Sequence, residues 1–149
     1  MTVRITLADM HMVVAMMRAA AKRHVMPFFR CLDRTDIRNK TGPLDIVTVA
    51  DEATERDLTD ALRAAWPDAL VVGEEAVAAN PRLLDGLATA ALAFVIDPID
   101  GTANFAAGVP LFGVMVSVVS HGQVIGGAIV DPVCDVAVLA ARGRTARGL

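Results

Sequence analysis

The chain has 149 residues and a formal net charge of −3, and 54% of its residues are apolar. This length and apolar content fit one domain with a substantial core and exclude a disordered chain. Without an excess of basic charge, nucleic acid is not expected as a general partner. Cys31 and Cys134 lie far apart and lack metal-ligand spacing. We therefore expect both cysteines to be reduced and structural.

The N-terminal residues lack the basic region, apolar core and small-residue cleavage site of a secretory signal, so a cytoplasmic location is expected. The first predicted element is a long helix, because apolar residues recur at helical spacing from Met10 to Phe28. Thr6 and Asp9 resemble a capping box at its start. Pro27 is expected to end or kink this helix.

Residues 36–49 predict a hairpin, with a turn at Gly42-Pro43 and a second arm over 44–49. A second helix is expected from Asp51 or Glu52 to about Ala65, where Trp66-Pro67 ends it. A short strand over 70–72 follows. Asn80-Pro81 then begins another helix, with Asn as the N-cap and Pro in the first turn, that runs to about residue 87.

An apolar run over 90–96 predicts a buried strand. Residues 101–130 then carry no formal charge, and a segment of that length would suit a membrane helix. Glycines and Pro110 interrupt it, and Ser120-His121-Gly122-Gln123 predicts a turn between two strands, 112–119 and 124–130. We therefore expect a buried hairpin and no membrane partner, followed by a last strand near 136–140.

Helices and strands mix without strict alternation, which favours an α+β or layered αβα arrangement over a Rossmann fold. No G-x-G-x-x-G sequence follows a strand, and no Walker A sequence occurs. We find no repeats and no linker, so we expect a single domain over residues 1–149.

Acidic clusters stand where three of the predicted strands end: Asp51, Glu74-Glu75 and the pair Asp97 and Asp100. If these strands are neighbours with a common polarity, the carboxylates converge and need cations to neutralise them. Hard divalent cations prefer such oxygen ligands. Gly101-Thr102 follows at once, and backbone N–H groups at a helix start favour an anion. The layout therefore predicts metal ions facing a phosphate.

Simpler interpretations stay open for each residue alone. Asp51 could serve only as a helix N-cap. Glu74-Glu75 could be solvated surface, and Asp97 and Asp100 could be turn formers. The combination with Gly101-Thr102 favours the metal interpretation.

The residues 97–102, Asp-Pro-Ile-Asp-Gly-Thr, resemble the signature of the inositol monophosphatase family of metal-dependent phosphatases. Gly73-Glu74-Glu75 resembles the second motif of that family. The segment 45–51, with Lys40 just upstream, resembles the first. The order and spacing of all three agree. The resemblance implies a layered α/β sandwich of the inositol monophosphatase and fructose-1,6-bisphosphatase type.

The resemblance also implies roles for single residues. Glu74, Asp97 and the carbonyl of Ile99 would hold a first Mg²⁺, and Asp97 and Asp100 a second; Glu74 would also touch a third, weaker ion. Asp51 and Thr102 would pair and activate a water molecule held by the metal. The backbone N–H groups of Gly101 and Thr102 would bind the phosphate. Glu75 and Lys40 match more weakly, and Lys40 could be only a solvated lysine.

The implied activity is Mg²⁺-dependent hydrolysis of a small phosphate monoester by a metal-activated water. Inositol monophosphate is the first expectation for the substrate. A 3′(2′),5′-bisphosphate nucleotidase, a histidinol-phosphate phosphatase and an inactive metal-binding fragment are the alternatives. Family members are also usually homodimers.

Members of this family are roughly twice as long as one 150-residue domain. The resemblance therefore implies that the chain corresponds to the N-terminal, metal-binding half, truncated after the first sheet. Two expectations follow: a weak second metal site, because one carboxylate ligand belongs to the other half, and apolar surface exposed on the hairpin strands.

Overall fold

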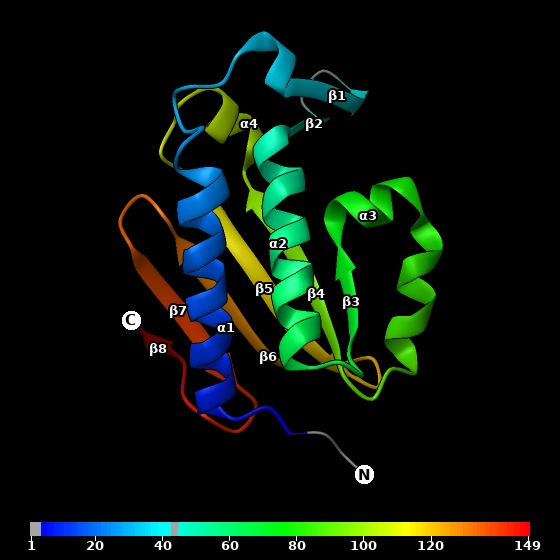
Figure 1. Cartoon of the computed structure of the whole chain (residues 1–149). Helices are drawn as coiled ribbons and strands as arrows, with labels where there is room; N and C mark the ends of the chain where they lie inside the picture. Colours follow the sequence, from blue (N-terminus) through cyan, green and yellow to red (C-terminus); the bar gives the residue numbers. More distant parts are fainter. Residues whose placement is uncertain (1–3, 43–44) are drawn as a thin grey trace.

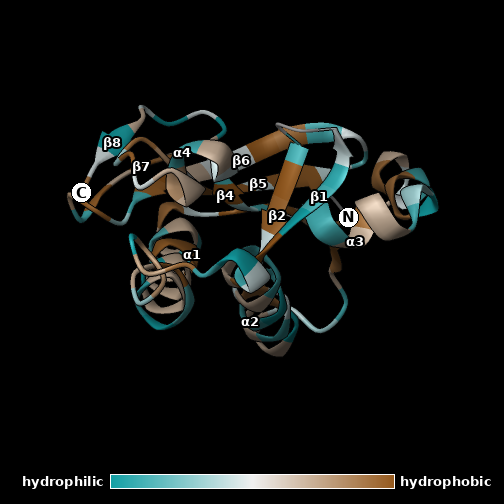
Figure 2. Cartoon of the chain, turned by 90° about the horizontal axis from the view of Figure 1, so that it is seen from above, coloured by the Kyte–Doolittle hydropathy of each residue, from teal (hydrophilic) through white to brown (hydrophobic). Residues whose placement is uncertain are grey.

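The computed structural model describes residues 4–42 and 45–149 (Figure 1). Two long helices, α1 (Leu7–Ala20) and α2 (Val49–Ala65), lie against a six-stranded sheet. Figure 2 shows both helices on the same side of that sheet. The mixture of helices with a mixed sheet confirms the predicted α+β class.

The first helix begins as predicted. Thr6 is its N-cap, and its side chain and that of Asp9 form the expected capping box. The buried stripe includes Met10, Val13 and Met17. The helix continues as a π-helical segment, η1 (Ala21–Val25), and the chain leaves the helix close to Pro27.

A short 3-10 helix, η2 (Arg34–Asp36), leads into the predicted hairpin, in which β1 (Ile37–Gly42) pairs antiparallel with β2 (Asp45–Thr48). These two strands form a sheet of their own. Pro43 of the predicted turn, and Leu44, where the predicted second arm begins, lie outside the described residues.

Helix α2 begins at Val49, two to three residues earlier than predicted. The N-cap is Thr48, whose side chain accepts from the Asp51 N–H while the Asp51 carboxylate accepts from the Thr48 N–H. This capping box, which the sequence analysis overlooked, places Asp51 in the first turn rather than before it. The helix ends at Trp66, as expected.

The main sheet has the strand order β3-β4-β5-β6-β7-β8. Only β3 (Leu70–Gly73) and β4 (Ala93–Asp100) pair in parallel; β5 (Gly113–Ser120), β6 (Gln123–Asp131), β7 (Val136–Ala141) and β8 (Arg147–Gly148) follow as antiparallel neighbours. The predicted hairpin over 112–130 is confirmed as β5 and β6. The last strand, β8, was not predicted.

Two further helices lie between β3 and β4. Helix α3 (Glu74–Ala79) was not predicted, whereas the helix at Asn80-Pro81 was, and it forms the 3-10 helix η3 (Pro81–Ala88). The strand expected over 90–96 begins only at Ala93 and runs on to Asp100. Residues 97–100 of the signature segment are therefore strand, and the turn at Gly101 leads into helix α4 (Thr102–Ala106).

The core lies between the sheet and the helices. It includes Phe94, Ile96, Val116 and Leu139 from the sheet, and Trp66 packs on Phe94 with ring centroids 4.9 Å apart. Cys31 and Cys134 are free, as expected of reduced cysteines, and both are exposed rather than part of the core. Among the described residues, no helix has the length and apolar character that a membrane crossing requires.

The other face of the main sheet is apolar but open. Exposed residues on it include Val124, Ile129, Val136 and Val138. They alternate along β6 and β7 with buried neighbours that face the helices. The expected exposure of apolar surface on the hairpin strands is confirmed.

Candidate functional site

The three acidic clusters meet at one end of the molecule. The carboxyl ends of β3 and β4 lie there together with the first residues of α2, α3 and α4 (Figure 1). Only two of the three strands are parallel neighbours, because β2 belongs to the small sheet. Asp51 reaches the site through α2, so the condition of neighbouring strands with a common polarity holds for the second and third clusters but not for the first.

An irregularity in β4 brings Asp97 and Asp100 to one face of the sheet. Residues three apart on a regular strand point to opposite faces. Here Asp97 pairs with Met115 and Asp100 with Gly113, so three steps on β4 oppose two steps on β5. This extra residue is a bulge. Since Met115 and Gly113 are two residues apart and share a face, the carboxylates opposite them share that face too.

The buried Asp51 and the half-buried Thr102 form a hydrogen-bonded pair. The hydroxyl of Thr102 lies 3.0 Å from Asp51 Oδ1 and 2.8 Å from the carbonyl oxygen of Ile99. Asp51 is fully buried, and its Oδ2 accepts the N–H of Thr48 at 2.7 Å. Desolvation raises the pKa of Asp51, although the hydrogen bonds from Thr48 and Thr102 oppose this. Asp51 therefore caps its helix and also holds Thr102.

Gly101 makes the turn from β4 into α4. Its φ of 87° lies in the left-handed region, and a Cβ there would come within 2.9 Å of the carbonyl oxygen of Leu111. Only glycine suits this position. The turn sets Thr102 at the start of α4, facing Asp51.

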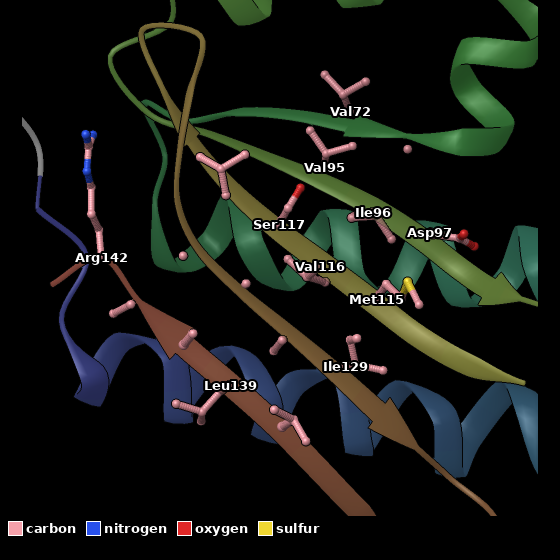
Figure 3. Close-up of a pocket in the computed structure, with 18 of the residues that line it drawn as sticks. Val72, Val95, Ile96, Asp97, Met115, Val116, Ser117, Ile129, Leu139 and Arg142 are labelled. Atoms are coloured by element: carbon pink, nitrogen blue, oxygen red, sulfur yellow. The ribbon is translucent and has the colours of Figure 1, made fainter. Parts of the chain in front are cut away.

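Asp97 is a half-buried carboxyl with an unused acceptor. Within the described residues, its buried Oδ1 has no hydrogen-bond partner. Desolvation, followed by the neighbouring Glu74 carboxyl, raises the pKa of Asp97 to about 7. Asp97 and Glu74 line a hollow of about 870 Å³ on the open face of the sheet, whose other walls are mostly apolar (Figure 3). A cation beside Asp97 would satisfy this carboxyl.

Lys40 from β1 bridges the two glutamates of the second cluster. Its Nζ lies 3.0 Å from Glu74 Oε1 and 2.8 Å from Glu75 Oε2. Burial lowers the pKa of Lys40, but its hydrogen bonds to Glu75 and Glu74 outweigh this and raise it. The side chains of Lys40 and Glu75 are 14% and 13% exposed, so neither is a solvated surface residue. Desolvation raises the pKa of Glu75.

Glu55 belongs to the same site and was missed by the sequence analysis. It is 8% exposed, and its carboxylate accepts the N–H groups of Glu75 and Ala76 at 2.7 and 2.9 Å. Desolvation raises its pKa. A signal was present in the sequence: Glu55 lies at helical spacing from Leu58 and Leu62, on the buried face of α2 that also carries Asp51.

Across the described residues, no group of three acidic, histidine or cysteine side chains is arranged to hold a metal ion. One physical reason is visible: the ammonium of Lys40 engages Glu74. The remaining chemistry still fits a hard divalent cation, because Glu74, Asp97, Asp100 and the Ile99 carbonyl offer only oxygen donors. The unpartnered Oδ1 of Asp97 also needs a donor or a cation.

The comparisons with known proteins agree on one family. The model of the inositol monophosphatase family matches residues 9–148. The chain is similar to the Nus factor SuhB of Pseudomonas aeruginosa, with 36% identity over 121 residues, covering 79% of this chain and 43% of that protein. It is also similar to an inositol-1-monophosphatase of Mycobacterium bovis, with 36% identity over 107 residues, covering 72% of this chain and 36% of the relative.

A solved structure has the same fold. An IMPase from Thermotoga maritima matches with a TM-score of 0.81 and 27% identity, over 95% of this chain and 51% of that one. The chain thus spans about half the length of this relative, and less than half of the two relatives above. The predicted sandwich of the inositol monophosphatase type is confirmed.

Proposed function

Because the chain belongs to the inositol monophosphatase family, we propose that it takes part in the hydrolysis of a small phosphate monoester. The observation that carries this proposal is the pair of the buried Asp51 and the half-buried Thr102, together with the half-buried Asp97. A hydroxyl held by a buried carboxylate is arranged to pass on a proton. An unsatisfied carboxylate oxygen next to it is arranged to bind a cation.

In this proposal Glu74, Asp97 and the carbonyl of Ile99 hold one Mg²⁺, and Asp97 and Asp100 hold a second. When bound, the ions would lower the pKa of a water molecule and neutralise the charge of the phosphate. A third ion at Glu74 is part of the same proposal.

The residues of the chain would then move the proton and orient the phosphate. When the Thr102 hydroxyl donates its hydrogen bond to Asp51 Oδ1, its oxygen can accept a hydrogen bond from the attacking water. The N–H groups of Gly101 and Thr102 would donate to the phosphate oxygens. Lys40 and Glu75 would set the charge around Glu74.

The proposed substrate is inositol monophosphate, in a cytoplasmic setting, and a homodimer is the proposed assembly. The names of relatives support this substrate, since several, among them those of Mycobacterium bovis and Rhizobium meliloti, are called inositol-1-monophosphatases. Their matching regions make up 36% of each relative, so substrate and assembly are proposed here for a chain that covers only part of those proteins.

The test is phosphate release from inositol 1-phosphate by the chain, with Mg²⁺ and with EDTA. We expect turnover that needs Mg²⁺, that is lost in Asp97→Asn and that survives in Asp60→Asn, which changes an exposed acid on α2. Turnover that persists in EDTA, or that Asp97→Asn leaves unchanged, would rule the proposal out.

A second candidate is metal binding without turnover. Its specific support is the engagement of Glu74 by Lys40, together with the lack of a preformed three-ligand group in the described part of the chain. Saturable Mg²⁺ binding by a folded chain that releases no phosphate would favour this candidate over the first.

A further inference from the structure

Glu55 makes an unusual contact between two helices. It stands on α2 one turn after Asp51, and its carboxylate crosses to the start of α3. The first N–H groups of a helix have no partner within that helix. Glu55 Oε2 accepts from Glu75 and Oε1 from Ala76, so both oxygens serve the first turn of α3.

Helix α3 has no cap of its own. Its N-cap residue is Gly73, which offers no side chain to accept these N–H groups. Glu55 supplies from another helix what a Ser, Thr or Asp would supply from the N-cap position. A charged acceptor makes a stronger hydrogen bond than a neutral one, and this carboxylate is 8% exposed.

The side chain of Glu55 fills the space where a side chain of residue 73 would begin. The φ of Gly73, −106°, is ordinary, so no turn requires glycine there. A Cβ on residue 73, however, would lie 2.1 Å from Glu55 Cδ and 2.4 Å from Glu55 Oε1. Contacts this short do not occur, so the carboxylate occupies the space that any larger residue would need. The glycine of the Gly73-Glu74-Glu75 motif is thus explained by Glu55.

One helix therefore fixes two parts of the site. From the same face of α2, Asp51 holds Thr102 and Glu55 holds the first turn of α3. Glu74 lies at the start of that turn, and it adjoins Asp97 along the edge of the 870 Å³ hollow. The pairing of Gly73 with Ile96 already brings the backbone of Glu74 next to that of Asp97, and the first turn of α3 sets the direction in which the Glu74 side chain leaves it.

We infer that Glu55 is a positioning residue, which sets Glu74 against Asp97 by capping α3 from α2. The inference rests on the proposed function for its consequence, metal binding, but not for its geometry. Partners that orient a metal ligand typically contribute about tenfold to a hundredfold to metal affinity.

The principal test is Mn²⁺ binding to the whole chain, followed by the electron paramagnetic resonance signal of the free ion. We expect Glu55→Gln to weaken binding by about tenfold to a hundredfold, because an amide cannot accept both N–H groups as the carboxylate does. Asp60→Asn makes the same chemical change at an exposed position of α2 and should leave affinity unchanged. Binding is measured well below the unfolding midpoint of each variant. A lower midpoint with unchanged Mn²⁺ affinity would overturn the inference.

A double-mutant cycle tests the pairing with Gly73. Gly73→Ala alone should weaken Mn²⁺ binding as Glu55→Gln does, because the new Cβ displaces the carboxylate. In a Glu55→Ala background the same substitution has nothing to displace, so it should weaken binding no further. Additive losses would contradict the shared mechanism.

A metal-free measurement separates the two proposals. If the unaltered chain binds no Mn²⁺, the metal-dependent function fails, and the carbon-13 resonance of the Glu74 carboxyl decides the role of Glu55. A shift of that resonance in Glu55→Gln, with hydrogen exchange faster at Glu75 and Ala76 and neither change in Asp60→Asn, supports the inference. An unmoved Glu74 resonance overturns it.

Discussion

Both faces of the six-stranded sheet are rich in apolar side chains, but helices cover only one of them. The face toward α1 and α2 packs Phe94, Val116 and Leu139 into a closed core. The opposite face presents Ile129 and Val138, which are 48% and 52% exposed, around the hollow that reaches Asp97. Strands apolar on both faces are typical of sheets with layers on both sides. An apolar run predicts such a strand, but because both of its faces are apolar, its sequence does not indicate which face is covered.

The largest expected effect comes from a cavity in the covered face. Phe94→Ala should lower the free energy of unfolding by about 3–5 kcal/mol, because Phe94 is fully buried against Trp66. Val138→Ala, on the open face, should change it by about 0.5 kcal/mol or less. Urea denaturation of both variants measures the contrast. Equal losses would mean that the open face is covered in solution.

The pair of Thr102 and Asp51 connects the start of α4 to the first turn of α2, a helix of the covered face. Thr102→Val should lower the free energy of unfolding by about 1–3 kcal/mol, since the buried carboxylate loses a donor. Thr89→Val removes an exposed hydroxyl that donates only a 3.4 Å bond to Gly86, and it should have little effect. Thermal unfolding of the two variants checks this, and a similar midpoint for both would count against a stabilising bond between Thr102 and Asp51.

The ionisation of Asp97 on the open face should make the free energy of unfolding depend on pH. The pKa of Asp97 is raised from 3.8 to about 7 by desolvation and by Glu74. On raising the pH, the unfolded chain therefore releases this proton near pH 4, whereas the folded chain keeps it until near pH 7. The free energy of unfolding of the metal-free chain should fall as the pH rises through this window.

The variant Asp97→Asn tests whether Asp97 causes this fall in the free energy of unfolding with pH. The substitution should make the decline between pH 4 and pH 7 shallower but not abolish it, because Asp51, Glu55 and Glu75 also have raised pKa values. Urea titrations in EDTA at several pH values measure the slope. An unchanged slope in Asp97→Asn would assign the effect to the other three carboxyls.

The smallest effect on stability, and the clearest effect on association, is expected from the open face itself. Ile129 and Val138 are cross-strand partners, so changing both to Thr keeps β-branched side chains and removes apolar surface. The free energy of unfolding should change by about 0.5 kcal/mol or less for each residue. Size exclusion with light scattering should show less concentration-dependent association than in the unaltered chain. If the unaltered chain is a monomer at every concentration, the expectation that the open apolar face promotes association is refuted.

The sequence determined most of the elements, because their signals are local. Helical spacing with a Thr6 capping box predicted α1, and Asn80-Pro81 predicted the start of η3. The motif at residues 97–102 and its resemblance predicted the family, which the comparisons confirm. The start of α2 was misplaced only because the equally local Thr48 box was overlooked.

Only the tertiary structure decided how the site is assembled. A spacing of three residues puts Asp97 and Asp100 on opposite faces of a regular strand, and only pairing with β5 creates the bulge that brings them to one face. In the sequence Glu55 is not distinguished from the other acidic residues of α2, and its role follows only from the packing of α3 and Gly73 against it. Lys40 reaches Glu74 and Glu75 from a separate sheet. Side chains far apart in sequence interact only when packing fixes their separation, and no local pattern records that distance.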